Sequence, residues 1–132
     1  MSLHETPLLR RYWQQVGGIL VEEFPAVRAA AGCSPRYIDG IIIRSSQTRL
    51  AQPSEISIRG EHITVVQVKK GRLGMSLMGQ ALFSIDLMLP FQPASVQSVA
   101  LCERTDAVLQ RLFERHPNCR VVTMDTLQHS HK

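Results

Sequence analysis

The sequence predicts an α/β fold with the element order αβββαβαβ in a single domain. Three observations support this prediction: apolar residues recur at helical spacing near the start of the chain, β-branched runs follow, and the last third alternates strand, helix and strand patterns. A chain of 132 residues can bury one hydrophobic core but not two. We therefore expect one domain over residues 1–127 and a flexible tail over residues 128–132.

Residues 8–24 form the first predicted helix, which ends at Pro25. Its apolar residues recur every three or four positions: Leu9, Tyr12, Trp13, Val16, Ile19, Leu20 and Phe24. At about 100° per residue, Glu23 falls on the apolar side of this helix. Burying a carboxylate is costly without a partner. Glu23 is therefore at a frayed helix end, paired with an arginine, or bound to a cation.

Three predicted strands follow this helix. The first is RYIDGIII at 36–43, and an exposed polar connection separates it from a short strand, SEISIRG, at 54–60. The third, HITVVQVKK at 62–70, has the strongest strand pattern. Residues 59–61 between the second and third strands resemble a hairpin turn.

The rest of the chain returns to helical and strand patterns in alternation. Residues 71–90 switch to a helical period, and VQSVALCE at 96–103 is a buried strand. Thr105 is the expected N-cap of a helix over 106–116, Pro117 and Asn118 stop it, and CRVVTMD at 119–125 is the last strand. This βαβ unit predicts parallel pairing with a right-handed crossover.

Polar residues interrupt two of the apolar strands. Asp39 lies within the run at 36–43, and Gln67 and Lys69 lie within the run at 62–70. Alternate side chains of a strand share a face about 7 Å apart, so Gln67 and Lys69 point one way and Val66 and Val68 the other. If the two runs pair as neighbours, a carboxylate, an amide and an ammonium converge. Such a group suits a hard cation and phosphodiester cleavage, and the alternative is a set of solvated strand residues.

The basic residues concentrate around these positions. Residues 28–72 contain eight basic and three acidic residues, a net charge of +5, whereas the whole chain has +4, so the remainder has −1. A positive surface of this kind attracts polyanions and makes binding sensitive to salt. Nucleic acid is the expected partner, with Lys70 and Arg72 among the contacts, and the alternative is a basic patch of the kind common on small domains.

Composition limits the other possibilities. No apolar stretch approaches the roughly 18 residues needed to span a bilayer, and the N-terminus lacks the pattern of a secretory signal, so we expect a soluble, cytoplasmic protein. Cys33, Cys102 and Cys119 are odd in number and far apart, which fits neither a disulfide framework nor a zinc site. No P-loop, zincin or hydrolase-elbow motif is present.

The element order, with Asp39 on one strand and Gln67-x-Lys69 on a later one, resembles the PD-(D/E)XK (restriction-endonuclease-like) nuclease superfamily over residues 8–125. The resemblance implies a three-layer sandwich around a central mixed sheet. It also implies that Glu23 on the first helix joins Asp39 and Gln67 in the site, and that Gln80 faces the site or nucleic acid. Gln67 departs from the usual acidic residue, as in Mrr-type and TnsA-type enzymes, and Ile38 stands where the family often has proline.

The resemblance implies a Mg²⁺- or Mn²⁺-dependent endonuclease that hydrolyses DNA. Glu23, Asp39, Gln67 and the carbonyl of Val68 would hold the cation, and Lys69 would orient water or stabilise charge on the phosphate. A short chain leaves little room for a targeting domain, so we expect a second copy or a partner protein to supply specificity. Two alternatives stay open: a nucleic-acid-binding module of the same fold that has lost catalysis, and an α/β domain that binds another protein.

Overall fold

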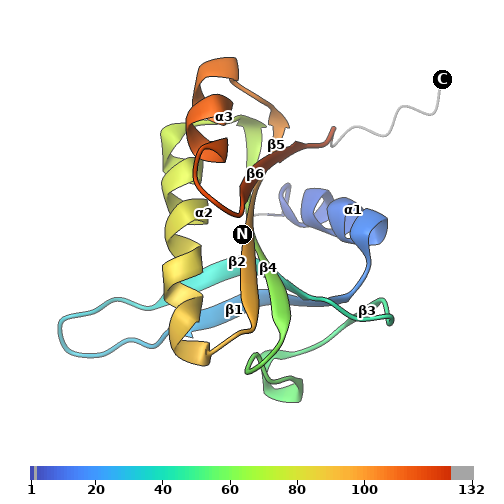
Figure 1. Ribbon diagram of the computed structural model, residues 1–132, viewed down its shortest axis with the longest axis vertical. Coiled ribbons are helices and arrows are strands. Elements are labelled where there is room, and N and C mark those ends of the chain that lie inside the picture. The colour runs from blue at the N-terminus through green and yellow to red at the C-terminus, as the bar shows by residue number, and fades with distance from the viewer. Residues whose placement is uncertain (2, 126–132) are drawn as a thin grey trace.

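The computed structural model describes residues 1 and 3–125, which form three layers around one mixed β-sheet. Figure 1 shows α1 on one side of the sheet and α2 and α3 on the other. The predicted tail at 128–132 lies outside the described residues. Among the described helices, none is long and apolar enough to cross a membrane.

The elements follow one another in the order α1 (Thr6–Val16), β1 (Ile19–Val27), β2 (Arg36–Ile43), β3 (Arg49–Leu50), β4 (His62–Arg72), α2 (Met75–Met88), β5 (Ser95–Arg104), α3 (Ala107–Glu114) and β6 (Cys119–Thr123). Two short 3-10 helices lie at Pro53–Glu55 and Leu89–Phe91. The predicted α/β class is confirmed, and so are the strands at 36–43, 62–70, 96–103 and 119–125 and the helix within 71–90, each to within a few residues.

The sheet has the strand order β3-β1-β2-β4-β5-β6. β2 is antiparallel to both β1 and β4, and the short edge strand β3 is parallel to β1, whereas β4, β5 and β6 run parallel to one another. The parallel pairs require the crossovers through α2 and α3, so the predicted parallel βαβ unit is confirmed. The central strand β4 therefore joins the antiparallel part of the sheet, β1-β2-β4, to its parallel half, β4-β5-β6.

The first predicted helix is too long, because the structure ends α1 at Val16 and begins β1 at Ile19. Gly17 and Gly18 separate them with φ angles of 74° and 94°, a conformation that glycine adopts without a Cβ clash. Beyond these glycines, Leu20 packs with α1 on one face and Phe24 packs on the other. An irregular strand thus reproduced the spacing of a helix, and Glu23 lies on β1 rather than on α1.

Two further expectations are wrong. Residues 54–60 are not a strand: the 3-10 helix Pro53–Glu55 and irregular chain follow one another there, and Ile58 is buried from a loop. The sequence of this segment alternates between apolar and polar residues because Ile56 and Ile58 both cover the core. The short edge strand β3 was not predicted. The N-cap of α3 is Asp106, whose carboxylate accepts the Leu109 N–H, rather than Thr105.

The hydrophobic core lies on both faces of the sheet. On one face, Leu8, Leu9, Tyr12 and Trp13 of α1 pack on residues of β4 and β5. On the other face, α2 packs along β4 and β5, and α3 covers the parallel half. Burial on both faces explains why β4 and β5 are nearly continuous apolar runs.

We predict opposite effects for two glycine-to-alanine substitutions. A Cβ at Gly18 would lie 2.6 Å from the carbonyl oxygen of Ile43 at a φ of 94°, so Gly18→Ala should lower the free energy of unfolding by more than about 2 kcal/mol. A Cβ at Gly79, within α2, meets nothing within 4 Å, so Gly79→Ala should raise it by roughly 0.5–1 kcal/mol. Urea denaturation measures both, and a stable Gly18→Ala protein would contradict the assigned turn.

Candidate functional site

The strands β2 and β4 separate where Asp39 lies. Their backbone pairing runs from Ile43 and Ile63 to Gly40 and Val66, and β4 continues beyond it, paired with β5. Next to the last pair, a carboxylate takes the place of a backbone partner: Asp39 Oδ2 accepts the Val68 N–H at 2.8 Å. The N–H and C=O of one residue in a strand point to the same side, so the Val68 carbonyl also faces this gap.

Gln67 connects the gap to helix α2. Its Oε1 atom lies 3.4 Å from the Asp39 backbone N–H, and its Nε2 donates to Ser84 Oγ at 2.9 Å. The Ser84 hydroxyl donates in turn to the Gln80 carbonyl oxygen at 2.6 Å. Gln67 thus faces α2, whereas Val66 and Val68 pack with α1, so the predicted alternation of side chains is confirmed. The pairing of the Asp39 and Gln67 strands as neighbours is confirmed as well.

Glu23 reaches the same place from β1. The register pairs Glu22 with Gly40 and Phe24 with Ile38, which sets Glu23 beside Asp39 across the two strands. Its φ of 51° marks a local irregularity that is unusual for a residue with a side chain. The neighbouring Glu22 points elsewhere and forms a salt bridge with Arg10 at 2.8 Å.

The carboxylates of Glu23 and Asp39 approach one positive charge. The α-amino nitrogen of Met1 lies 3.0 Å from Glu23 Oε2 and 3.9 Å from Asp39 Oδ1. The hydrogen bond that this amino group donates to Glu23 raises its pKa. A single cation between strands β1 and β2 can therefore interact with both carboxylates.

Burial controls the protonation of Asp39. Loss of solvent around its carboxyl group, whose side chain is 15% exposed, raises the pKa of Asp39 to about 6. The Val68 N–H and the Met1 ammonium oppose this shift, while the negative charge of Glu23 adds to it. A cation at this position would favour the ionised carboxylate and lower the pKa again.

Lys69 and Gln80 lie at the edge of this cluster. Lys69 is exposed, and among the described residues its side chain has no hydrogen-bond or ion-pair partner. It lines a small cavity of about 140 Å³ together with Val68, Arg72 and Gln80. Gln80 also lines a larger groove of about 580 Å³ that contains Gln67, so it connects the Lys69 cavity to the Gln67 groove.

Lys70 and Arg72, the two other basic residues expected near nucleic acid, differ in whether the side chain contacts the rest of the protein. Lys70 is exposed beside Lys69. Arg72 donates from Nη1 to the Thr105 carbonyl oxygen at 2.8 Å, which ties its guanidinium to the start of α3. Arg72 therefore has a structural partner besides any role at a surface.

Sequence reasoning missed several residues of the Gln67 groove. Arg36 and Tyr37 line it from β2, and Phe83 and Ser84 line it from α2. Tyr37 and Phe83 are 57% and 62% exposed, although both are aromatic. The signal available in the sequence was the spacing of four between Gln80 and Ser84, which places both on one side of the helix.

The donor set suits a hard cation with few protein ligands. Within the described residues there is no group of three His, Cys, Asp or Glu side chains that could hold a metal ion. Glu23 and Asp39 supply two carboxylates around one position, and Mg²⁺ commonly uses one or two carboxylates and several waters. Gln67 is not turned toward that position, because its amide is engaged by Ser84 and the Asp39 backbone.

Asp39→Asn should stabilise the metal-free protein at neutral pH. The pKa of Asp39 is about 6 in the folded protein, whereas the ordinary value is 3.8. The free energy of unfolding of the wild type therefore rises as the pH falls from about 6 to about 4. Above pH 6 the ionised carboxylate lowers this free energy by roughly 3 kcal/mol. Asparagine keeps an oxygen for the Val68 N–H but carries no charge. Urea denaturation at pH 4 and 7.5 should show the gain mainly at pH 7.5.

The matched control is Asp86→Asn, which removes an exposed carboxylate from α2. It should change stability by less than about 0.5 kcal/mol at either pH. Lower stability of Asp39→Asn at both pH values would show that the carboxylate is a net stabilising group.

Comparisons of the chain with protein-family models, curated proteins and solved structures gave no match. The likeness to any family therefore rests on the chain's own residues and geometry.

Proposed function

We propose that this protein is a divalent-metal-dependent endonuclease that hydrolyses phosphodiester bonds in DNA. One observation carries the proposal: β2 and β4 separate at Asp39, and two carboxylates there approach a single positive charge while Lys69 follows on the adjoining strand. The sheet order β1-β2-β4-β5, with α1 and α2 on opposite faces, supports a restriction-endonuclease-like fold.

Each residue has a distinct role in this proposal. Glu23 and Asp39 hold Mg²⁺ or Mn²⁺, with the Val68 carbonyl as a further oxygen. The bound ion would neutralise charge on the scissile phosphate and activate water. Lys69 donates a hydrogen bond to the attacking water or to a phosphate oxygen, and its lack of another partner among the described residues leaves it available.

Gln67 acts through Asp39 rather than on the cation directly. Its amide oxygen faces the Asp39 N–H and its amide nitrogen is held by Ser84, so it positions the strand that carries the carboxylate. Gln67 is thus a positioning residue in this proposal. A glutamine in this place keeps the metal site at two negative charges.

The groove beside the site fits nucleic acid. Exposed Tyr37 and Phe83 offer flat faces on which bases can stack, and Arg36 and Gln80 add a positive charge and an amide. The basic stretch at 28–72 supplies the electrostatic attraction for the backbone.

A second candidate is a nucleic-acid-binding module of the same fold without catalysis. Its support is the engagement of Gln67 with Ser84, which turns the amide away from the cation position. Incubation of the protein with plasmid and single-stranded DNA in Mg²⁺, Mn²⁺ or EDTA separates the two candidates. Metal-dependent cleavage supports the nuclease, whereas salt-dependent binding without cleavage supports the module, and absence of both contradicts each of them.

Lys69→Ala should lower the cleavage rate by about 100-fold or more without changing the melting temperature, because an exposed lysine contributes charge rather than packing. The control is Lys70→Ala, which removes the same charge one position along β4. It should reduce cleavage only a few-fold, through weaker DNA binding at low salt. Plasmid nicking under single-turnover conditions measures both, and equal losses would remove the special role of Lys69.

Gln67→Glu should destabilise the metal-free protein and tighten Mg²⁺ binding. The new carboxylate would face Asp39, and the Ser84 hydroxyl cannot donate to it because its proton is engaged by the Gln80 carbonyl. Calorimetric Mg²⁺ titration and thermal melting measure the two effects. Gln14→Glu, an exposed change on α1, is the control for added charge, and an equal Mg²⁺ affinity in all three proteins would separate Gln67 from the cation site.

A further inference from the structure

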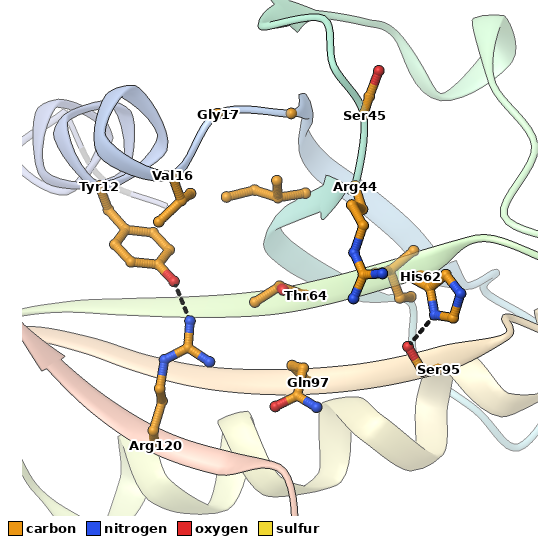
Figure 2. Close-up of a pocket in the computed structure, with 13 residues that line it drawn as sticks. Tyr12, Val16, Gly17, Arg44, Ser45, His62, Thr64, Ser95, Gln97 and Arg120 are labelled. Atoms are coloured by element: carbon orange, nitrogen blue, oxygen red, sulfur yellow. Dashed lines mark hydrogen bonds between the residues drawn. The ribbon is translucent and has the colours of Figure 1, made fainter.

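A second polar cavity lies far from Asp39, beside α1 (Figure 2). It has a volume of about 160 Å³ and opens beside α1, at the ends of β2 and β4 opposite to the Asp39 cluster. His62 and Lys69 are seven positions apart on β4, which corresponds to roughly 23 Å along a strand. The cavity is therefore a separate site.

Among the described residues, the walls of the cavity carry positive charge and no negative charge. None of the residues that line it is acidic, and the two arginines among them are Arg44 and Arg120. In Figure 2 the guanidinium groups of Arg44 and Arg120 lie on either side of Thr64. Two cations that face one space repel each other, and an anion between them would relieve this repulsion.

Neither guanidinium is neutralised by an acidic residue of the part of the chain that the structure describes. Arg120 donates from Nη2 to the Tyr12 hydroxyl at 2.7 Å, which fixes its position but brings no charge. The Arg44 side chain has no hydrogen-bond or ion-pair partner among the described residues. One cation is thus held in place by α1, and the other is free to close on a ligand from the end of β2.

Neutral polar groups complete the walls. The His62 Nδ1 and Ser95 Oγ atoms are 2.7 Å apart, so these two side chains form one hydrogen-bonded edge between β4 and β5. Thr64 adds a hydroxyl between the two arginines in Figure 2, and Ile42 adds an apolar side chain to the lining. A volume of about 160 Å³ corresponds to roughly five waters, which is enough for one tetrahedral oxyanion and less than a whole nucleotide requires.

We infer that this cavity binds a phosphate group between Arg44 and Arg120. Guanidinium groups match phosphate oxygens with paired N–H donors, and Arg is suited to such sites because it stays charged. The phosphate comes from a free phosphate or mononucleotide, or from the backbone of a polynucleotide that continues out of the open cavity. This site does not depend on the proposed nuclease, because it shares no residue with the Asp39 cluster.

The test titrates the full chain with inorganic phosphate, adenosine monophosphate and a short single-stranded oligonucleotide at constant ionic strength, monitored by NMR. We expect resonances of Arg44, Thr64 and Arg120 to shift with phosphate. Arg44→Gln should weaken phosphate binding about tenfold, and it breaks no interaction among the described residues, so its fold should be unchanged. Arg115→Gln, which removes an exposed charge outside every cavity described above, should leave the affinity unchanged.

Two outcomes support the inference and identify the source of the phosphate, and three others would overturn it. Oligonucleotide binding that requires Arg44 and is displaced by inorganic phosphate assigns the site to a nucleic-acid backbone. Arg44-dependent binding of phosphate or mononucleotide alone assigns it to a free phosphate. Equal weakening by Arg44→Gln and Arg115→Gln, an equal response to acetate, or no shift at Arg44 and Arg120 would overturn the inference.

Discussion

The hydrogen bond from the Val68 N–H to Asp39 organises the candidate site. It replaces a backbone bond between β2 and β4 at the point where their pairing stops, so the central strand stays satisfied while the two strands separate. The same contact draws a carboxylate into a poorly solvated position, where its ionisation is unfavourable. The gap and the buried charge therefore share one structural cause, and the register of β1 on β2 adds Glu23 beside them.

Stability and the proposed function oppose each other at this position. A carboxylate beside another carboxylate has no stabilising role unless a positive charge lies between them, and the Met1 ammonium provides such a charge in the structure. The surrounding sheet offsets the cost, since β4 is buried on both faces and paired on both sides. A rigid central strand is thus what allows an unfavourable charge arrangement to persist.

The sequence predicted the central part of the fold better than its N-terminal part. Runs such as VVQV and SVALC have one interpretation, because β-branched residues buried on both faces suit a strand within a sheet. The segment from Val16 to Phe24 fitted two periods, since the irregularity at Glu23 shifts the alternation of β1 until it matches a helix. Asp39 and Gln67 were identified as neighbours because both lie on clear strands. The Tyr37 and Phe83 groove was missed, because it depends on how α2 lies against β2.

The irregularity at Glu23 also affects how the protein avoids association with itself. β3 covers only Ile19 and Leu20 of β1, so the remainder of β1 lies at the border of the sheet, where a foreign strand could add. Glu23 breaks the regular spacing of this border, and Pro25 has no N–H to offer to an incoming strand. The residue that places a carboxylate next to Asp39 therefore also makes this border a poorer template for an added strand.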